Sequence, residues 1–159
     1  MAGNNGLCKI ICTQPRRMAA VSVATRVAQE RAENLSGYGN QSSIGYHVKL
    51  DSKPPRDSCS IMYCTPGIIL QWLRQDQFLT KCTHLVLDEV HERDLETDFL
   101  MAICKIIVEH RPDLKVILMS ATMNTDKFSH YFKNKRTGVP APVIEIPGKM
   151  YDVEEMYSG

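Results

Sequence analysis

Short apolar runs alternate with helical patterns along the 159 residues of this chain. Runs of three to six mostly apolar residues, bounded by polar residues, glycine or proline, are typical of strands buried in a parallel sheet. Such runs occur at Cys8–Cys12, Ser60–Cys64, Leu85–Leu87, Lys115–Met119 and Val143–Ile146, with a weaker alternation at Gly45–Leu50.

Between these runs, apolar residues recur at the spacing of a helix. The predicted helices cover Met18–Glu33, Ile68–Arg74, Leu95–Glu109 and Asp126–Phe132. In the first helix, Val23, Val27 and the neighbouring alanines form the apolar stripe. In the third, the stripe consists of Leu95, Phe99, Ile103, Ile106 and Ile107.

Residues 1–6, 34–43 and 51–57 are predicted to be loops or connections. Alternating strands and helices predict βαβ units, and so an α/β fold with a mostly parallel sheet flanked by helices.

Composition limits the class of protein but indicates no function. The length suits one domain over residues 1–159, and the 43% hydrophobic and 23% charged shares are ordinary for a globular protein. A net charge of +1 gives no general attraction to nucleic acid, so such binding would have to rest on local residues. No apolar run approaches the roughly 18 residues of a membrane span, so no membrane partner is expected. The six cysteines show no C-x-x-C spacing and are predicted to be small buried hydrophobes in a reducing compartment.

The most informative polar residues follow the run Leu85–Leu87. Asp88 and Glu89 come directly after it, and His91 lies two residues further on. Adjacent carboxylates repel each other, and a hard divalent cation completed by substrate phosphates is a common way to compensate that repulsion. The second carboxylate can then orient or deprotonate a water molecule. A solvated acidic turn after a strand explains Asp88 and Glu89 alone equally well.

Four polar clusters follow four of the predicted strands. Right-handed crossovers bring the carboxyl ends of parallel strands to one edge of the sheet, where ligands bind. The clusters are Thr13–Arg17, Thr65–Gly67, Asp88–His91 and Ser120–Thr122. The sequence therefore predicts one extended site at this edge.

Arg16 and Arg17 precede a helix, where the helix dipole disfavours positive side chains unless an anion is present. A phosphate backbone would supply that anion, although a solvated basic turn remains a simpler explanation. Thr65-Pro66-Gly67 offers a hydroxyl and a close backbone approach but needs no ligand. An N-cap would account for one of the hydroxyls of Ser120 and Thr122.

In this order and spacing, the clusters resemble the motifs of one family. Cys12–Arg17 is similar to helicase motif Ia, Cys64–Gly67 to motif Ib, Asp88–Arg93 to motif II in its DEVH spelling, and Ser120–Thr122 to motif III. The chain resembles the first RecA-like domain of the DEAH/RHA group of superfamily 2 RNA helicases, truncated before motif Ia. Residues 67–73 lean toward the RHAU type, the branch that resolves G-quadruplexes.

The resemblance implies roles by position. Asp88 and Glu89 would hold Mg²⁺ on ATP, and Glu89 would activate the attacking water. His91, also at the nucleotide, would couple the nucleotide state to motif III. Ser120 and Thr122 would link hydrolysis to domain movement. Residues that the family would place at the RNA are Thr13, Pro15, Arg16, Arg17, Gly45, Tyr46, Thr65, Pro66 and Gly67.

The P-loop pattern G-x-x-x-x-G-K-[ST] does not occur; the only Gly-Lys, Gly148-Lys149, is followed by Met150. The chain alone is therefore expected to bind ATP and Mg²⁺ weakly or not at all and to be inactive, with a second RecA-like domain as its partner. The strand before a P-loop would lie beside Lys115–Met119, so its loss would expose an apolar edge there.

Two other functions stay open. One is a non-catalytic RNA-binding or protein-interaction module, and the other is a RecA-like ATPase acting on protein or membrane cargo. The Thr-Gln-Pro-Arg-Arg and Thr-Pro-Gly turns on one edge argue against the latter. The substrate is expected to be RNA, with DNA or a G-quadruplex as variants, in the nucleus or cytoplasm.

Overall fold

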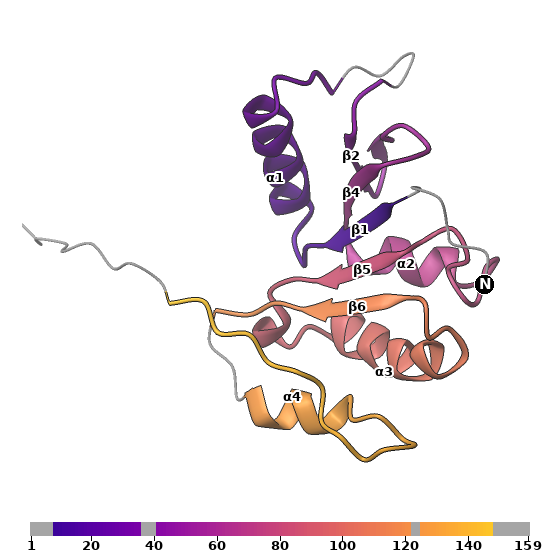
Figure 1. The fold of residues 1–159 in the computed structure, drawn as a ribbon. Coiled ribbons are helices and arrows are strands. Elements are labelled where there is room, and N and C mark those ends of the chain that lie inside the picture. Colours follow the sequence, from indigo (N-terminus) through magenta and orange to yellow (C-terminus); the bar gives the residue numbers. More distant parts are fainter. Residues whose placement is uncertain (1–7, 36–40, 122–124, 148–159) are drawn as a thin grey trace, which may run out of the picture. The chain divides into compact units, whose positions relative to one another are not determined.

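A computed structural model describes residues 8–35, 41–121 and 125–147. The chain divides into two compact units, residues 1–123 and 124–159, and each is described by itself. The first unit contains a six-stranded sheet with helices on both faces (Figure 1). This arrangement is the predicted α/β fold, consistent with a RecA-like domain.

The strands follow the order β3-β2-β4-β1-β5-β6 across the sheet. Their bounds are β1 Lys9–Thr13, β2 Ile44–Val48, β3 Asp51–Lys53, β4 Ser60–Cys64, β5 His84–Leu87 and β6 Lys115–Leu118. All neighbouring pairs are parallel except β2 and β3. The mostly parallel sheet is therefore confirmed, and β1, β2, β4, β5 and β6 fall within about two residues of their predicted positions.

The helices are α1 Arg17–Glu30, α2 Pro66–Trp72, α3 Leu95–His110 and, in the second unit, α4 Thr125–Tyr131. A short 3₁₀ turn, η1, covers Val90–Glu92. Helix α1 lies on one side of the sheet, with α2 and α3 on the other (Figure 1). None of the helices in the described ranges is both long and apolar enough to cross a membrane.

Helix α1 packs on the sheet through small residues. Its buried positions are Ala20, Ala24 and Ala28, which form a core cluster with Ile44, Tyr46 and Val48 of β2. Methyl side chains at intervals of four residues let the helix backbone approach the strands closely. Val27 is only partly buried against this cluster, so the alanines form the centre of the predicted stripe.

The face that α3 buries differs from the prediction. Leu95, Phe99 and Ile106 are exposed by 85%, 58% and 58%, and only Ile107 of the predicted stripe is fully buried. The buried face instead consists of Thr97, Leu100, Met101, Cys104 and Ile107. The prediction chose the wrong side of the helix because apolar residues occur on more than one face of α3: Leu100 and Met101 are as apolar as Phe99 and Ile106, and the buried Thr97 and Cys104 beside them give a weak hydrophobic signal.

One predicted connection and one predicted strand also differ from the structure. Asp51–Lys53, predicted as part of a loop, forms β3 and pairs antiparallel with β2. The two strands join through Lys49 and Leu50, and Leu50 takes a positive φ of 70°. Conversely, Val143–Ile146 is no strand, because the described part of the second unit holds no strand to pair with it.

Strand β6 is at the edge of the sheet among the described residues. Ile117 and Met119 are exposed by 43% and 39%. This is the apolar edge that the sequence predicted beside Lys115–Met119. The cysteine prediction holds only in part: Cys12, Cys64, Cys82 and Cys104 are buried, but Cys8 and Cys59, which directly precede β1 and β4, are exposed.

Candidate functional site

The four polar clusters meet at one edge of the sheet, as predicted. Strands β4, β1, β5 and β6 are consecutive neighbours and parallel, so their carboxyl ends lie side by side. Backbone bonds continue the ladder past the strand ends: Gln14 N–H donates to Cys64 O at 2.8 Å, and Asp88 N–H to Thr13 O at 3.2 Å. Turns from four strands thus form a continuous polar row.

The turn after β5 sets the direction of the acidic side chains. Glu89 has left-handed backbone angles, φ 57° and ψ 33°, which cost a residue with a Cβ about 1 kcal/mol or more. Val90 then points into the core with no exposed surface, and its N–H donates to Met119 O at 3.2 Å. Because Val90 anchors the turn, the side chains of Glu89 and His91 remain partly exposed on either side of it.

Asp88 is fixed by two donors. Gln14 Nε2 donates to Asp88 Oδ2 at 2.6 Å, and the Glu89 N–H donates to Asp88 Oδ1 at 2.8 Å. Each carboxylate oxygen can accept about two hydrogen bonds, so each keeps a position for a cation or its water. The donor set therefore fits Mg²⁺. Gln14 lies within the predicted motif, but the sequence alone assigned it no role. Only the fold reveals that Gln14 is buried, with 6% exposed.

His91 joins the acidic turn to the end of β6. Its Nδ1 lies 3.4 Å from Glu89 Oε2 and 3.2 Å from Ser120 Oγ. Depending on the tautomer, the ring donates to the carboxylate or accepts from the hydroxyl. Thr122, the second predicted hydroxyl, lies outside the described residues. The structure thus brings together Glu89, His91 and Ser120 as the sequence predicted.

Within the described ranges, no group of three or more His, Cys, Asp or Glu side chains is arranged to hold a metal. Asp88 and Glu89 supply two carboxylates at most, so a Mg²⁺ ion here would take further oxygen ligands from a bound substrate or from water. That need matches the prediction that substrate phosphates complete the shell.

Cys12 lies one residue before the end of β1, close to the acidic turn. Burial, together with the negative charge of Asp88, raises the pKa of its thiol to about 12. This shift favours the protonated thiol at neutral pH, which is a poor nucleophile.

The basic half of the edge is exposed. Arg16 precedes α1 and makes no capping bond, and Arg17 is the first residue of the helix. Arg16 forms an ion pair with Glu92, Nη2 to Oε1, at 3.1 Å, with the Arg16 side chain 74% exposed. The first turn of α1 holds no acidic residue, so its positive charge is offset locally only by Glu92 from the neighbouring turn.

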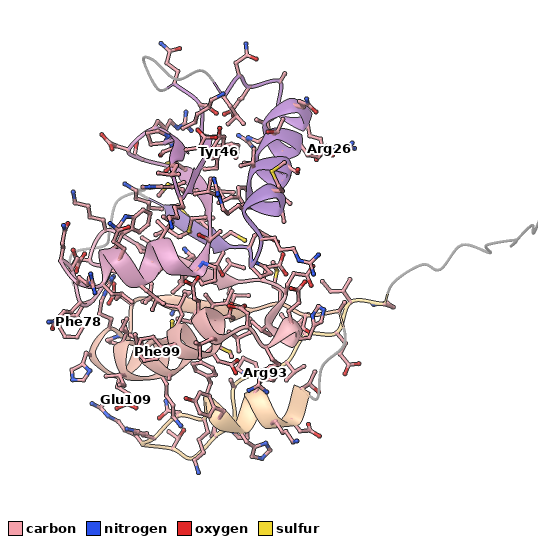
Figure 2. All side chains as sticks on the ribbon, turned by 180° about the vertical axis from the view of Figure 1, so that it is seen from behind. Arg26, Tyr46, Phe78, Arg93, Phe99 and Glu109 are labelled. Atoms are coloured by element: carbon pink, nitrogen blue, oxygen red, sulfur yellow. The ribbon has the colours of Figure 1, made fainter. Side chains whose placement is uncertain are left out.

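Several predicted RNA residues do not reach the surface. Thr13 is fully buried, with its hydroxyl 3.5 Å from Val86 O. Tyr46 is 3% exposed, lies between the sheet and α1 (Figure 2), and donates its hydroxyl to Asp51 Oδ2 at 2.9 Å. At Gly45 a Cβ would lie 2.4 Å from the backbone nitrogen of Pro55. The side chains of Thr13 and Tyr46 are therefore buried away from a ligand in this structure, and Gly45 permits close packing against residues 53 and 55.

The Thr65–Gly67 turn divides in the same way. Pro66 is buried, and Thr65 occupies the N-cap of α2 without using its hydroxyl for a capping bond. At Gly67 a Cβ would lie 2.9 Å from a carboxylate oxygen of Glu96. Thr65 and Gly67, both half-buried, are thus the residues of this turn that a ligand can reach.

Comparison with known proteins decides the family. The sequence profile of the DEAD/DEAH box helicases matches residues 4–129. The chain belongs to the DEAD/DEAH box helicase family. The DEVH turn, with Asp88 held beside Glu89, and the Ser120 contact lie within this match.

Individual helicases resemble the chain over nearly its whole length. It is 54% identical over 153 residues to the human ATP-dependent DNA/RNA helicase DHX36, covering 96% of this chain and 14% of that protein. It is 44% identical over 157 residues to the chicken ATP-dependent RNA helicase DHX30, covering 99% of this chain and 12% of that protein. The DHX36 relatives support the branch that residues 67–73 suggested. The chain spans about one seventh of the length of these relatives.

Proposed function

We propose that this chain is the part of an ATP-dependent RNA helicase in which the acidic turn for ATP hydrolysis meets the surface that holds RNA. The observation that carries the proposal is the shared edge: Asp88 and Glu89, which follow β5, lie next to the exposed Arg16 and Arg17, which follow β1. The match to the helicase family and the names of the relatives support ATP and nucleic acid as the ligands.

The nucleotide half rests on the two carboxylates. Asp88, with both oxygens already oriented by donors, would hold Mg²⁺ directly or through water. The ion, when bound with ATP, would offset the charge of the phosphates. Glu89, whose side chain is partly exposed, would orient and deprotonate the attacking water.

His91 and Ser120 form the connection to movement. The 3.2 Å contact between His91 Nδ1 and Ser120 Oγ joins the ends of β5 and β6, and His91 also contacts Glu89. A change in charge at Glu89 during hydrolysis would alter this contact. We propose that Ser120, with Thr122 two residues on, passes that change to a second RecA-like domain of the same protein.

The RNA half uses fewer residues than the family resemblance implied. Arg16 and Arg17 would contact phosphates, with the Thr65 hydroxyl and Gly67 backbone along the same strand of RNA. Such contacts read the sugar-phosphate backbone and not the bases, so binding would depend on salt and little on sequence. The buried residues beneath this surface would stabilise it by packing; they are Thr13, Gly45, Tyr46 and Pro66.

Hydrolysis by the full-length protein tests the proposal. Wild-type protein should hydrolyse ATP faster when single-stranded RNA is added, and Glu89→Gln should abolish turnover while leaving RNA binding intact. The 159-residue chain alone should show only background turnover. Turnover retained in Glu89→Gln would contradict the assignment of Glu89.

The same assay separates the alternative of a non-catalytic RNA-binding module. That reading requires salt-dependent RNA binding, weakened by changing Arg16 and Arg17, in a full-length protein whose ATP turnover does not respond to RNA. Competition between a folded G-quadruplex and an unstructured RNA of equal length would then test the substrate suggested by residues 67–73.

A further inference from the structure

We propose that Gln14 is a positioning residue for Asp88: its side-chain amide fixes the orientation of the carboxylate that would face Mg²⁺. The inference rests on the proposed function. Gln14 lies on the turn that also carries Arg16, so it places a residue of the RNA-facing turn in direct contact with the acidic turn.

The geometry restricts the carboxylate on both sides. Gln14 Nε2 lies 2.6 Å from Oδ2, and the Glu89 N–H lies 2.8 Å from Oδ1. The terminal torsion of an aspartate is otherwise broad and is easily turned. Two donors on opposite oxygens hold it in one orientation, and hydrogen bonds to a charged acceptor are roughly twice as strong as neutral ones.

Gln14 is itself well held. Its backbone N–H donates to Cys64 O at 2.8 Å, which ties the turn to β4. Pro15 follows, and a residue before proline is confined to extended backbone angles. The side chain is buried, with 6% exposed. Its amide must present Nε2, since the amide oxygen would meet the carboxylate as a second acceptor.

The side-chain type also matters. Methionine has nearly the same length but no donor, so Gln14→Met would leave one oxygen of Asp88 without its partner. Asparagine is shorter by one methylene and could not bridge the same gap. Residues that orient metal ligands from outside typically contribute about 10- to 100-fold to metal affinity or activity.

The test compares full-length Gln14→Met with wild type. Mn²⁺ replaces Mg²⁺, and its affinity for the protein with a bound non-hydrolysable ATP analogue is measured by electron paramagnetic resonance. We expect Gln14→Met to weaken Mn²⁺ binding about tenfold or more. It should also raise the Mg²⁺ concentration for half-maximal ATP hydrolysis, and high Mg²⁺ should restore much of the turnover. The exposed Gln29 of α1, changed to methionine, is the matched control and should match wild type.

A wild-type metal affinity in Gln14→Met would overturn the inference. If that variant does not fold, Gln14→Asn removes the same contact with less bulk and is judged by the same metal titration. Failure of the proposed function looks different: the wild-type protein itself would show no RNA-stimulated turnover.

Discussion

The ion pair between Arg16 and Glu92 makes a quantitative prediction about RNA binding. A phosphate can bind Arg16 fully only when the ion pair between Arg16 and Glu92 is broken. The two groups are 3.1 Å apart, with side chains 74% and 31% exposed, so the pair is solvent-screened. Exposed pairs contribute about 0.2–1 kcal/mol. Glu92→Gln should therefore tighten RNA binding by about 1.4- to 5-fold at low salt, since 1.4 kcal/mol is about tenfold.

Fluorescence anisotropy with a labelled single-stranded RNA measures this effect in the full-length protein. The gain should shrink as salt is raised, because salt screens exposed charges. Glu30→Gln is the control: it removes the same charge and an ion pair of 2.6 Å with Arg26, but from a later turn of α1. Equal gains in both variants, or weaker binding in Glu92→Gln, would refute competition at Arg16.

Three further predictions concern stability. Gly45→Ala should lower the free energy of unfolding by about 1–3 kcal/mol or more, because its Cβ would collide with backbone atoms of residues 53 and 55; an unchanged urea midpoint would contradict this. Asp94 caps α3, accepting from the Thr97 N–H at 3.0 Å, so Asp94→Ala should cost about 0.5–2 kcal/mol in thermal unfolding. Hydrogen bonds from Ser43, chiefly that of its side chain, lower the pKa of Glu33 from 4.5 to about 2. Glu33 therefore stabilises the fold above pH 4.5, and this contribution is lost as the pH falls toward 2. Glu33→Gln should flatten that part of the stability profile, and an unaltered profile would argue against it.

The sequence was sufficient for the layout of the edge. Short apolar runs ending in polar clusters located β1, β4, β5 and β6, and a weaker alternation located β2. The parallel crossover rule then placed the four clusters together. Asp88, Glu89, His91 and Ser120 needed only this rule to be grouped. The contacts among these side chains also depend on the left-handed backbone angles of Glu89, which the residue types in this turn do not predict.

The features that were not predicted from the sequence depend on contacts between residues that are distant along the chain. The hairpin at Leu50 lacks the Asn-Gly or Asp-Gly signal, so β3 was missed. Val143–Ile146 has the composition of a strand but no described neighbour to pair with. Burial also decides access: Tyr46 resembles an RNA-facing residue by position, yet the packing of α1 against β2 encloses it. Gln14 was missed for the same reason, since only the neighbouring strands bring it to Asp88.

We propose that one edge of the sheet carries two separable functions, ATP hydrolysis and RNA binding. The most direct measurement is ATP turnover by the full-length protein across an RNA titration, with wild type, Glu89→Gln and the double variant Arg16→Ala, Arg17→Ala. We expect Glu89→Gln to bind RNA without turning over ATP. We expect the arginine variant to keep RNA-free turnover but to need much more RNA for stimulation. An arginine variant stimulated at wild-type RNA concentrations would contradict this division of the edge.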